Sequence, residues 1–189
     1  MKNEIRKTNK ERRAAMNREE ALSKSLSAAQ LFLSTQLYKN ARQIMLYMPL
    51  GNETDTKAII NAALKDKKTV LLPVTNQANG EITPYETCET TSFEKGAFSI
   101  LEPQNAKKAD ISKIDVVVVP GIAFSKNGAR VGFGKGCYDR LLALTNATKV
   151  GFCYAFQLCD FVETEEHDIK MDYIVTENEI IKCNGSCEL

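Results

Sequence analysis

Val116-Val117-Val118-Val119-Pro120-Gly121 is the stretch that decides the fold of this 189-residue chain. Four consecutive β-branched residues predict a strand buried on both faces, as in parallel sheets that helices cover on both sides. Pro120 and Gly121 end the strand. The loop that follows should therefore lie at the carboxyl edge of the sheet, where α/β proteins bind their ligands.

The rest of the chain alternates strands with helices. We predict strands at residues 43–48, 69–74 and 149–154, an edge strand at 81–85, helices at 2–16, 18–38, 55–67, 138–144 and 155–160, and irregular structure at 87–110. This alternation favours an α/β fold, with one domain over residues 1–189 and a largely parallel central sheet carrying helices on both faces.

Two details of the helices are expected from local signals. Thr54 or Asp55 could cap the start of the helix at 55–67. In the helix at 18–38, apolar residues recur near the 3.6-residue period and should pack on the core; they are Leu22, Leu26, Ala29, Leu33 and Leu37.

The loop after the valine strand has the composition of a phosphate site. Gly132, Gly134 and Gly136 stand at every second position, with Arg130 and Lys135 nearby, and a helix is expected to start just beyond them. Glycines let backbone N–H groups converge on an anion, and the cations and the helix N-terminus add positive charge. The spacing matches neither of the standard nucleotide-binding glycine motifs, so a simple glycine-rich turn remains an alternative.

Composition narrows the class of protein. The 25 Lys and Arg residues balance 24 Asp and Glu, which disfavours a nucleic-acid or anionic-membrane binder. No apolar run approaches the roughly 18 residues that span a bilayer, and residues 1–20 have no apolar signal core. The six cysteines form no Cys-x-x-Cys pair, so reduced thiols are expected rather than zinc or a disulfide framework. We therefore expect a cytoplasmic protein that binds neither nucleic acid nor membrane.

The glycine loop resembles a known family signature. The run Val119-Pro120-Gly121-x-Ala123-Phe124, continued by Gly128-x-Arg130-x-Gly132-x-Gly134-Lys135-Gly136-x-Tyr138-Asp139-Arg140, is similar to that of the 5-formyltetrahydrofolate cyclo-ligase family. Further segments agree with the family, namely Lys2-x-x-Ile5-Arg6 with Arg13, Glu102-Pro103, Gly151 with Gln157, His167-Asp168, and Asp172 with Thr176-Glu177. The resemblance covers residues 2–177 and implies an architecture of the NagB/RpiA/CoA transferase-like kind; the tail at 179–189 resembles nothing diagnostic.

The resemblance implies an ATP- and Mg²⁺-dependent enzyme that closes the formyl group of 5-formyltetrahydrofolate onto N10, giving 5,10-methenyltetrahydrofolate, ADP and phosphate. Its substrates would be small molecules, and we expect a monomer. Lys135 and Arg130 are the implied catalytic cations. The implied ATP-binding residues are Lys2, Asn3, Glu4, Ile5, Arg6, Arg130, Val131, Gly132, Phe133, Gly134, Lys135, Gly136, Cys137 and Tyr138. The implied folate-binding residues are Met48, Glu53, Phe133, Gly134, Lys135, Gly136 and Cys137.

The resemblance also implies Asp139 and Asp172 as Mg²⁺ ligands. Other readings of these acids stay open, since Asp139 could favour the helix dipole and Asp172 could cap a strand. The same holds for Glu53, which precedes a helix, and for the basic N-terminus, which could be a solvated face. His167 is more readily a structural hydrogen bonder than an acid–base catalyst.

Two positions depart from the family pattern. Phe133 stands where a larger polar residue or tyrosine is common, and Cys137 stands where the family commonly has tyrosine. Phe133 can still stack on an aromatic ring. Alternative functions are a sugar-phosphate isomerase or acyl-CoA transferase relative, a non-catalytic nucleotide sensor, and, more weakly, a nucleic-acid binder.

Overall fold

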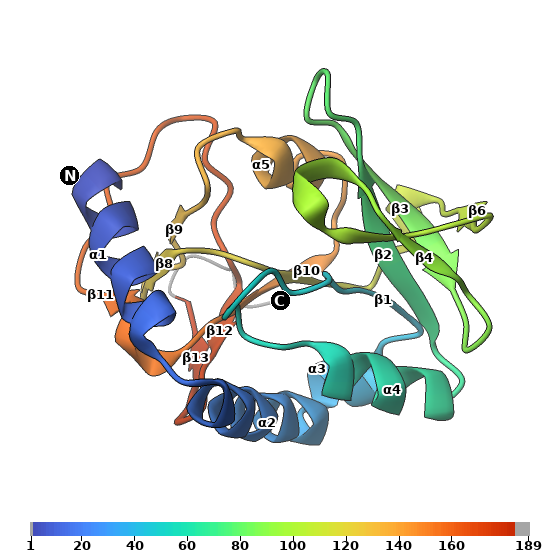
Figure 1. Cartoon of the computed structure of the whole chain (residues 1–189), viewed down its shortest axis with the longest axis horizontal. Helices are drawn as coiled ribbons and strands as arrows, with labels where there is room; N and C mark the ends of the chain where they lie inside the picture. The colour runs from blue at the N-terminus through green and yellow to red at the C-terminus, as the bar shows by residue number, and fades with distance from the viewer. Residues whose placement is uncertain (1, 184–189) are drawn as a thin grey trace.

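The computed structural model describes residues 2–183 and is built on a mixed sheet (Figure 1). Within these residues the sheet has eight strands, in the order β13 (Ile180–Lys182), β12 (Tyr173–Val175), β10 (Thr148–Phe152), β7 (Val116–Val119), β1 (Gln43–Met45), β2 (Thr69–Thr75), β3 (Ile82–Thr87) and β6 (Lys107–Lys108). The central strands from β12 to β2 run parallel, while β13, β3 and β6 join antiparallel. The largely parallel sheet is confirmed. Cys187 and the rest of the tail lie outside the described residues.

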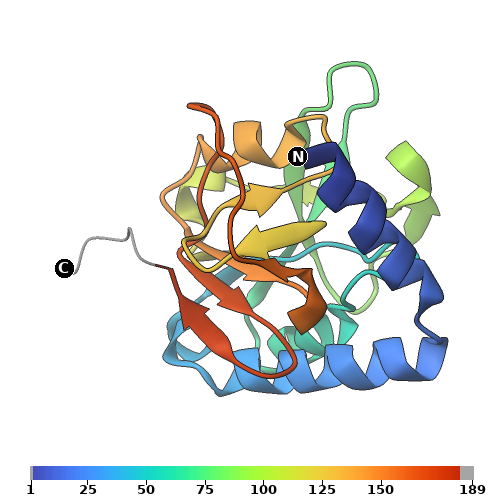
Figure 2. The ribbon, with the colours of Figure 1, turned by 90° about the vertical axis from the view of Figure 1, so that its left-hand side faces the viewer.

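Helices cover both faces of the sheet, as expected. In Figure 1 three helices lie below it and a fourth, short one lies above; they are α2 (Arg18–Ser34), α3 (Gln36–Asn40) and α4 (Lys57–Lys65) below, and α5 (Cys137–Leu142) above. The N-terminal helix α1 (Lys2–Ala15) descends along one side and meets the start of α2 (Figure 2). Because α1 lies beside the sheet, it is free to contribute side chains to the carboxyl edge.

The burial of β7 explains why four valines stand in a row. Val116 and Val118 pack in the apolar layer between the sheet and helices α2 and α4. Val117 and Val119 pack in the apolar layer between the sheet and α5. All four are at most 3% exposed. A strand with helices on both faces needs apolar side chains at every position, which confirms the two-sided burial predicted from the sequence.

The stretch between β7 and α5 contains structure that the sequence did not predict. Strands β8 (Ala123–Ser125) and β9 (Arg130–Val131) form a hairpin, and β11 (Leu158–Cys159) adds to it in parallel. The prediction of a helix at 155–160 is wrong, because residues Ala155–Gln157 form only a 3₁₀ turn and the next two residues form β11. Strand β9 of this small sheet contains Arg130 and leads directly into the glycine loop at Gly132.

The helix expected at 18–38 is broken at Thr35. The extended Thr35 ends α2 and caps α3, with its hydroxyl accepting a hydrogen bond from the backbone N–H of Tyr38 at 3.1 Å. The expected core face of this helix is only partly correct. Ala29 is fully buried and Leu33 and Leu37 pack against the core, whereas Leu22 and Leu26 are 48% and 51% exposed. The buried side of α2 is formed by Ala21, Ser25, Ala28, Ala29 and Phe32. Mostly small residues on this side allow α2 to lie close to its neighbours.

Several boundaries differ from the expectation. The first strand ends at Met45, three residues early, and α4 starts at Lys57. Neither Thr54 nor Asp55 is the N-cap residue of α4; Thr56 holds that position, and its hydroxyl donates to the carbonyl of Tyr47 instead of capping the helix. The predicted edge strand is β3, which lies inside the sheet between β2 and β6.

The region expected to be irregular, residues 87–110, holds a second hairpin and short turns. Its elements are β4 (Phe93–Lys95), a 3₁₀ turn at Ala97–Ser99, β5 (Leu101–Pro103) and β6, with another 3₁₀ turn following at Ile111–Lys113. Among residues 2–183, no helix is long and apolar enough to cross a bilayer.

Candidate functional site

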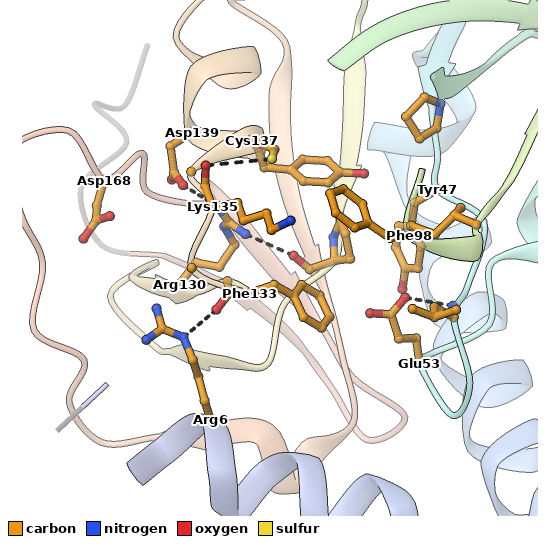
Figure 3. A pocket seen from close by; sticks show the side chains of 18 of the residues that line it. Arg6, Tyr47, Glu53, Phe98, Arg130, Phe133, Lys135, Cys137, Asp139 and Asp168 are labelled. Carbon is orange, nitrogen blue, oxygen red and sulfur yellow. Dashed lines mark hydrogen bonds and ion pairs between the residues drawn. The ribbon is translucent and has the colours of Figure 1, made fainter. Parts of the chain in front are cut away.

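A cavity of about 600 Å³ opens at the carboxyl edge of the parallel strands. Its wall is formed by α1, the segments after β1 and β7, the glycine loop, the turn at 98–100 and residues 165–168. Figure 3 shows two ends. Arg6, Asp139 and Asp168 lie toward one side, Glu53 and Tyr47 toward the other, and Phe133, Lys135 and Phe98 lie between them.

The glycine loop leaves its backbone open to the cavity. Gly134 and Gly136 adopt φ angles of 97° and 61°, which glycine tolerates and side-chain-bearing residues avoid. A Cβ at Gly132 would come within 2.8 Å of the Arg130 guanidinium. Gly136 is also the N-cap residue of α5, which begins at Cys137. Backbone amides of this loop can therefore face an anionic ligand without steric interference.

Arg130 is buried and paired. Its side chain is 5% exposed, and Nη2 lies 2.8 Å from Oδ2 of Asp139. Nη1 donates to the carbonyl of Pro120 at 3.3 Å, and Nε has no hydrogen-bond partner among the described residues. The guanidinium therefore braces Asp139 and the end of β7 as well as lining the cavity.

The first helix brings two cations to the same end. Lys2 Nζ lies 2.8 Å from Asp168 and 3.2 Å from Glu165, and the hydrogen bond with Asp168 raises the pKa of Lys2. Burial alone would raise the pKa of Asp168, but the hydrogen bonds from Lys2 and from the backbone N–H of Glu165, together with nearby positive charge, outweigh it and the pKa is lowered. Arg6 donates from Nε to the carbonyl of Gly132 at 2.9 Å. Helix α1 is thus fastened to the glycine loop at the point where phosphates would enter.

Lys135 stands apart from the other cavity cations. Its ammonium group lies 3.9 Å from the centroid of the Phe98 ring. Within residues 2–183 this ammonium group makes no ion pair or hydrogen bond. A cation held only by an aromatic face can move to an incoming phosphate more easily than one in an ion pair.

Glu53 dominates the opposite end. It is 8% exposed, accepts a hydrogen bond from the backbone N–H of Leu50 at 3.0 Å and pairs with Arg13 at 3.6 Å. Burial raises the pKa of Glu53, although the Leu50 N–H and Arg13 oppose the shift. The pKa values of the neighbouring phenols Tyr47 and Tyr138 are also raised, chiefly by burial. A carboxylate in this setting can accept N–H groups from a flat heterocycle.

Most residues implied by the resemblance line this one cavity. They are Lys2, Arg6, Met48, Glu53, Arg130, Gly132, Phe133, Gly134, Lys135, Gly136, Cys137, Tyr138 and Asp139. Four others support the wall from behind or lie outside it. Asn3 accepts a hydrogen bond from Arg6, Ile5 and Val131 pack together in a small apolar cluster, and Glu4 is exposed.

Asp172 is not brought to the cavity. Its carboxylate accepts a hydrogen bond from the backbone N–H of Lys149 at 2.8 Å and lies 3.8 Å from the ammonium of the same residue. The strand-capping reading of Asp172 fits this geometry, and the metal reading does not. Asp168, four residues before Asp172, does line the cavity together with Asp139 and Glu165.

Other wall residues were given no ATP, folate or metal role from the sequence; they are Tyr47, Leu50, Pro73, Pro120, Glu165, His167 and Asp168. The signal for Asp168 was present in the His167-Asp168 pair of the family resemblance. For Tyr47 and Pro73 no local signal exists, because such residues at strand ends look like ordinary core. Phe98 and Ile100 also line the cavity, and they belong to the segment 98–103 that the resemblance places on the folate side.

A largely parallel sheet with a cation-lined glycine loop and a cavity at its carboxyl edge is typical of α/β enzymes that bind phosphorylated ligands. Comparison with known proteins makes this specific. Residues 1–177 match the model of the 5-formyltetrahydrofolate cyclo-ligase family. The chain belongs to that family and is a folate-metabolising, ATP-dependent ligase.

Relatives and solved structures agree. The 5-formyltetrahydrofolate cyclo-ligase of Mus musculus is 27% identical over 184 residues, covering 89% of this chain and 90% of the mouse protein. The structure of Aquifex aeolicus 5,10-methenyltetrahydrofolate synthetase has a TM-score of 0.88 and 32% identity, covering 100% of this chain and 95% of that one. The Mycoplasma pneumoniae synthetase has a TM-score of 0.75 and 25% identity, with coverages of 93% and 98%. The comparisons thus favour the ligase over the isomerase, sensor and nucleic-acid alternatives.

Proposed function

We propose that this enzyme cyclises 5-formyltetrahydrofolate to 5,10-methenyltetrahydrofolate, with ATP cleaved to ADP and phosphate through a phosphorylated formyl oxygen. The observation that carries the proposal is the single cavity shared by the glycine loop and the buried Glu53, with Lys135 between them. ATP would occupy the end lined by the glycine loop, Lys2 and Arg6. The pterin would lie at the end lined by Glu53.

The chemistry requires positioning and charge neutralisation. A formyl oxygen attached to a carbon–nitrogen unit is a poor leaving group, so it must first become a phosphate ester. The oxygen attacks the γ-phosphorus, the bond to the β-phosphate oxygen breaks, and ADP leaves. N10 then attacks the formyl carbon and loses its proton, and phosphate departs with the original formyl oxygen. Lys135 and the loop amides would stabilise the charge on the transferring oxygens.

Asp139 and Asp168 fit a Mg²⁺ site that includes the nucleotide. Mg²⁺ is commonly held by one or two carboxylates together with phosphate oxygens and water. Among residues 2–183 no three His, Cys, Asp or Glu side chains gather into a complete metal site, which agrees with a metal that arrives with ATP. Bound there, the metal would neutralise phosphate charge. Arg130 and Lys2 hold these two carboxylates in place.

The proposal is tested by following the near-ultraviolet absorbance of methenyltetrahydrofolate after mixing the enzyme with 5-formyltetrahydrofolate and MgATP. A rise that needs both ATP and metal is expected, and an isotopically labelled formyl oxygen should appear in the released phosphate. An absorbance rise in which the labelled oxygen is released as water, and not in phosphate, would contradict the phosphorylated intermediate. No rise with folded, ATP-binding protein would contradict the reaction itself.

Lys135→Ala should lower kcat by about 10²- to 10³-fold, the usual loss when one transition-state charge stabiliser is removed. The Kd for ATP should change far less, because the loop amides, Lys2 and Arg6 remain. Lys126→Ala, which removes an exposed lysine from the turn of the β8–β9 hairpin, is the matched control. Equal losses in kcat for both variants would remove Lys135 from the catalytic step.

A further inference from the structure

Arg13 lies in the last turn of α1 and faces the folate end of the cavity. Its side chain is 12% exposed, and Nη1 is 3.6 Å from Oε1 of Glu53. Its guanidinium also lies 5.8 Å from the centroid of the Phe133 ring. Arg13 is not among the residues that line the cavity, whereas Glu53 and Phe133 both are. An effect of Arg13 on a ligand in the cavity would therefore pass through these two neighbours.

Arg13 and Arg6 serve different ends of the site although both come from α1. Seven residues separate them, which is about 10 Å along a helix. Arg6 contacts the glycine loop through the carbonyl of Gly132. Arg13 pairs with Glu53. The two arginines therefore reach different ends of the cavity, Arg6 the glycine loop and Arg13 the Glu53 end.

The backbone fixes Arg13 and Glu53 relative to each other. The side chain of Asn52 donates to the carbonyls of Arg13 and Met16, at 2.9 Å each, and so joins the end of α1 to the loop after β1. Glu53 is the next residue, and the Leu50 N–H holds its other carboxylate oxygen at 3.0 Å. The ion pair is thus built into a rigid junction and does not depend on two freely moving side chains.

We propose that Arg13 is a positioning residue for folate: it fixes the Glu53 carboxylate and the Phe133 ring and makes no contact with the ATP phosphates. The proposal rests on the proposed function, since it assigns the Glu53 end to the pterin. It separates the cations of α1 into a nucleotide group, Lys2 and Arg6, and a folate group, Arg13.

The charges around Glu53 support this role. Three titratable groups face it from different elements, namely Arg13 from α1, Tyr47 from the segment after β1 and Tyr138 from α5. Tyr47 is buried and Tyr138 is partly buried, and neither phenol carries a positive charge. Arg13 is the cation that opposes the effect of burial on Glu53, whose pKa is raised by that burial. Without Arg13, Glu53 would hold its proton to higher pH and could accept fewer N–H groups from a pterin.

The chain offers two matched controls on the same helix. Arg12 is exposed and makes none of these contacts, so Arg12→Gln changes net charge in the same way as Arg13→Gln. Lys10 shares the Phe133 ring, at 5.7 Å from its centroid, but does not pair with Glu53. Comparing Arg13→Gln with Lys10→Gln therefore separates the ion pair from the ring contact.

In steady-state kinetics, Arg13→Gln should raise the KM for 5-formyltetrahydrofolate by about tenfold or more, the usual effect of disturbing a charged hydrogen-bonding group. The KM for ATP should stay within about twofold. Arg13→Lys should recover part of the folate affinity, Arg12→Gln should behave as wild type, and Lys10→Gln should show a smaller loss than Arg13→Gln. An increase in the KM for ATP equal to that for folate would overturn the proposal and make Arg13 a phosphate ligand.

Two further measurements test the role of Arg13 separately from the proposed reaction. In the ligand-free protein, NMR titration of the Glu53 carboxyl carbon should show a higher pKa in Arg13→Gln than in wild type or Arg12→Gln. An unchanged Glu53 pKa would overturn the inference whatever the substrate is. In the Glu53→Gln background, adding Arg13→Gln should cause little further loss of folate affinity, whereas additive losses would show that Arg13 acts independently of Glu53.

Discussion

At the scale of single residues, Glu53 places ligand binding in conflict with stability. Burial raises its pKa in the folded protein, so the folded state binds this proton more tightly than the unfolded state does. Between the unfolded and the folded pKa, stability falls as pH rises. Above the folded pKa the full penalty of burying the charge is present. A carboxylate retained under such a penalty is expected to serve a ligand.

We expect Glu53→Gln to gain stability relative to wild type as pH rises from below the ordinary glutamate pKa to neutrality. The reason is that the variant has no charge to bury. The measurement is the free energy of unfolding of both proteins by chemical denaturation, once below the ordinary glutamate pKa and once at neutral pH. A change in packing contributes equally at both pH values and cancels when the two differences between variant and wild type are compared. Glu163→Gln, at an exposed glutamate, is the control. A relative stability that falls toward neutral pH would contradict the raised pKa.

At the scale of elements, one aromatic side chain of the β8–β9 hairpin packs closely against the central sheet. Phe124, in β8, is fully buried, and a Cβ built on Gly151 in β10 would lie 2.6 Å from its ring. A Cβ on Gly121 would lie 2.5 Å from the same ring. Two glycines therefore make the room in which Phe124 packs. Because β9 carries Arg130, this packing also positions the wall of the active site.

Gly151→Ala should destabilise the protein by about 1–3 kcal/mol, the usual cost of overpacking a core. For a chain of this size that corresponds to roughly 2–4 °C in Tm for each kcal/mol. Thermal unfolding checks it. In a Phe124→Leu background the same substitution should cost less, since the smaller side chain vacates the space. An equal cost in both backgrounds would show that Phe124 is not the group that excludes the Cβ.

At the scale of the whole molecule, the active site draws on nearly the full described length of the chain. Lys2 at one end of the sequence pairs with Asp168 near the other, and Glu53 and Lys135 come from between. A site assembled from such distant segments cannot form before the sheet does.

We therefore propose that the chain folds as one unit, and we keep the expectation from the family resemblance that it is a monomer. Differential scanning calorimetry should show a single transition whose calorimetric and van't Hoff enthalpies agree. Light scattering should give the mass of one chain. Two resolved transitions would argue for separate domains, and a larger mass would argue for an oligomer.

Much of the fold could be predicted from local sequence. Val116–Val119 predicted a strand covered on both faces, and the glycines at 132–136 predicted an open backbone next to a helix start. These predictions depend on short-range chemistry, namely β-branching and the φ angles that glycine allows. The same is true of the cation-rich composition of the loop, which indicated a phosphate.

Other features were decided by packing between distant segments. Leu22 and Leu26 have the right period for a core helix, yet the face of α2 that approaches the sheet is the one with small side chains. The hairpin of β8 and β9 depends on Phe124 finding room beside Gly151.

The sequence by itself determined the family and the largely parallel sheet and predicted a phosphate-binding loop, because these follow from residue types at fixed short spacing. Only the tertiary structure decided that Asp168 and not Asp172 reaches the cavity, since Asp172 turns to the backbone of Lys149. Only the tertiary structure showed that Arg130 is paired with Asp139 and that Arg13 faces Glu53. The direction in which a charged side chain points depends on which partner the fold brings within reach, and that partner lies far away in the sequence.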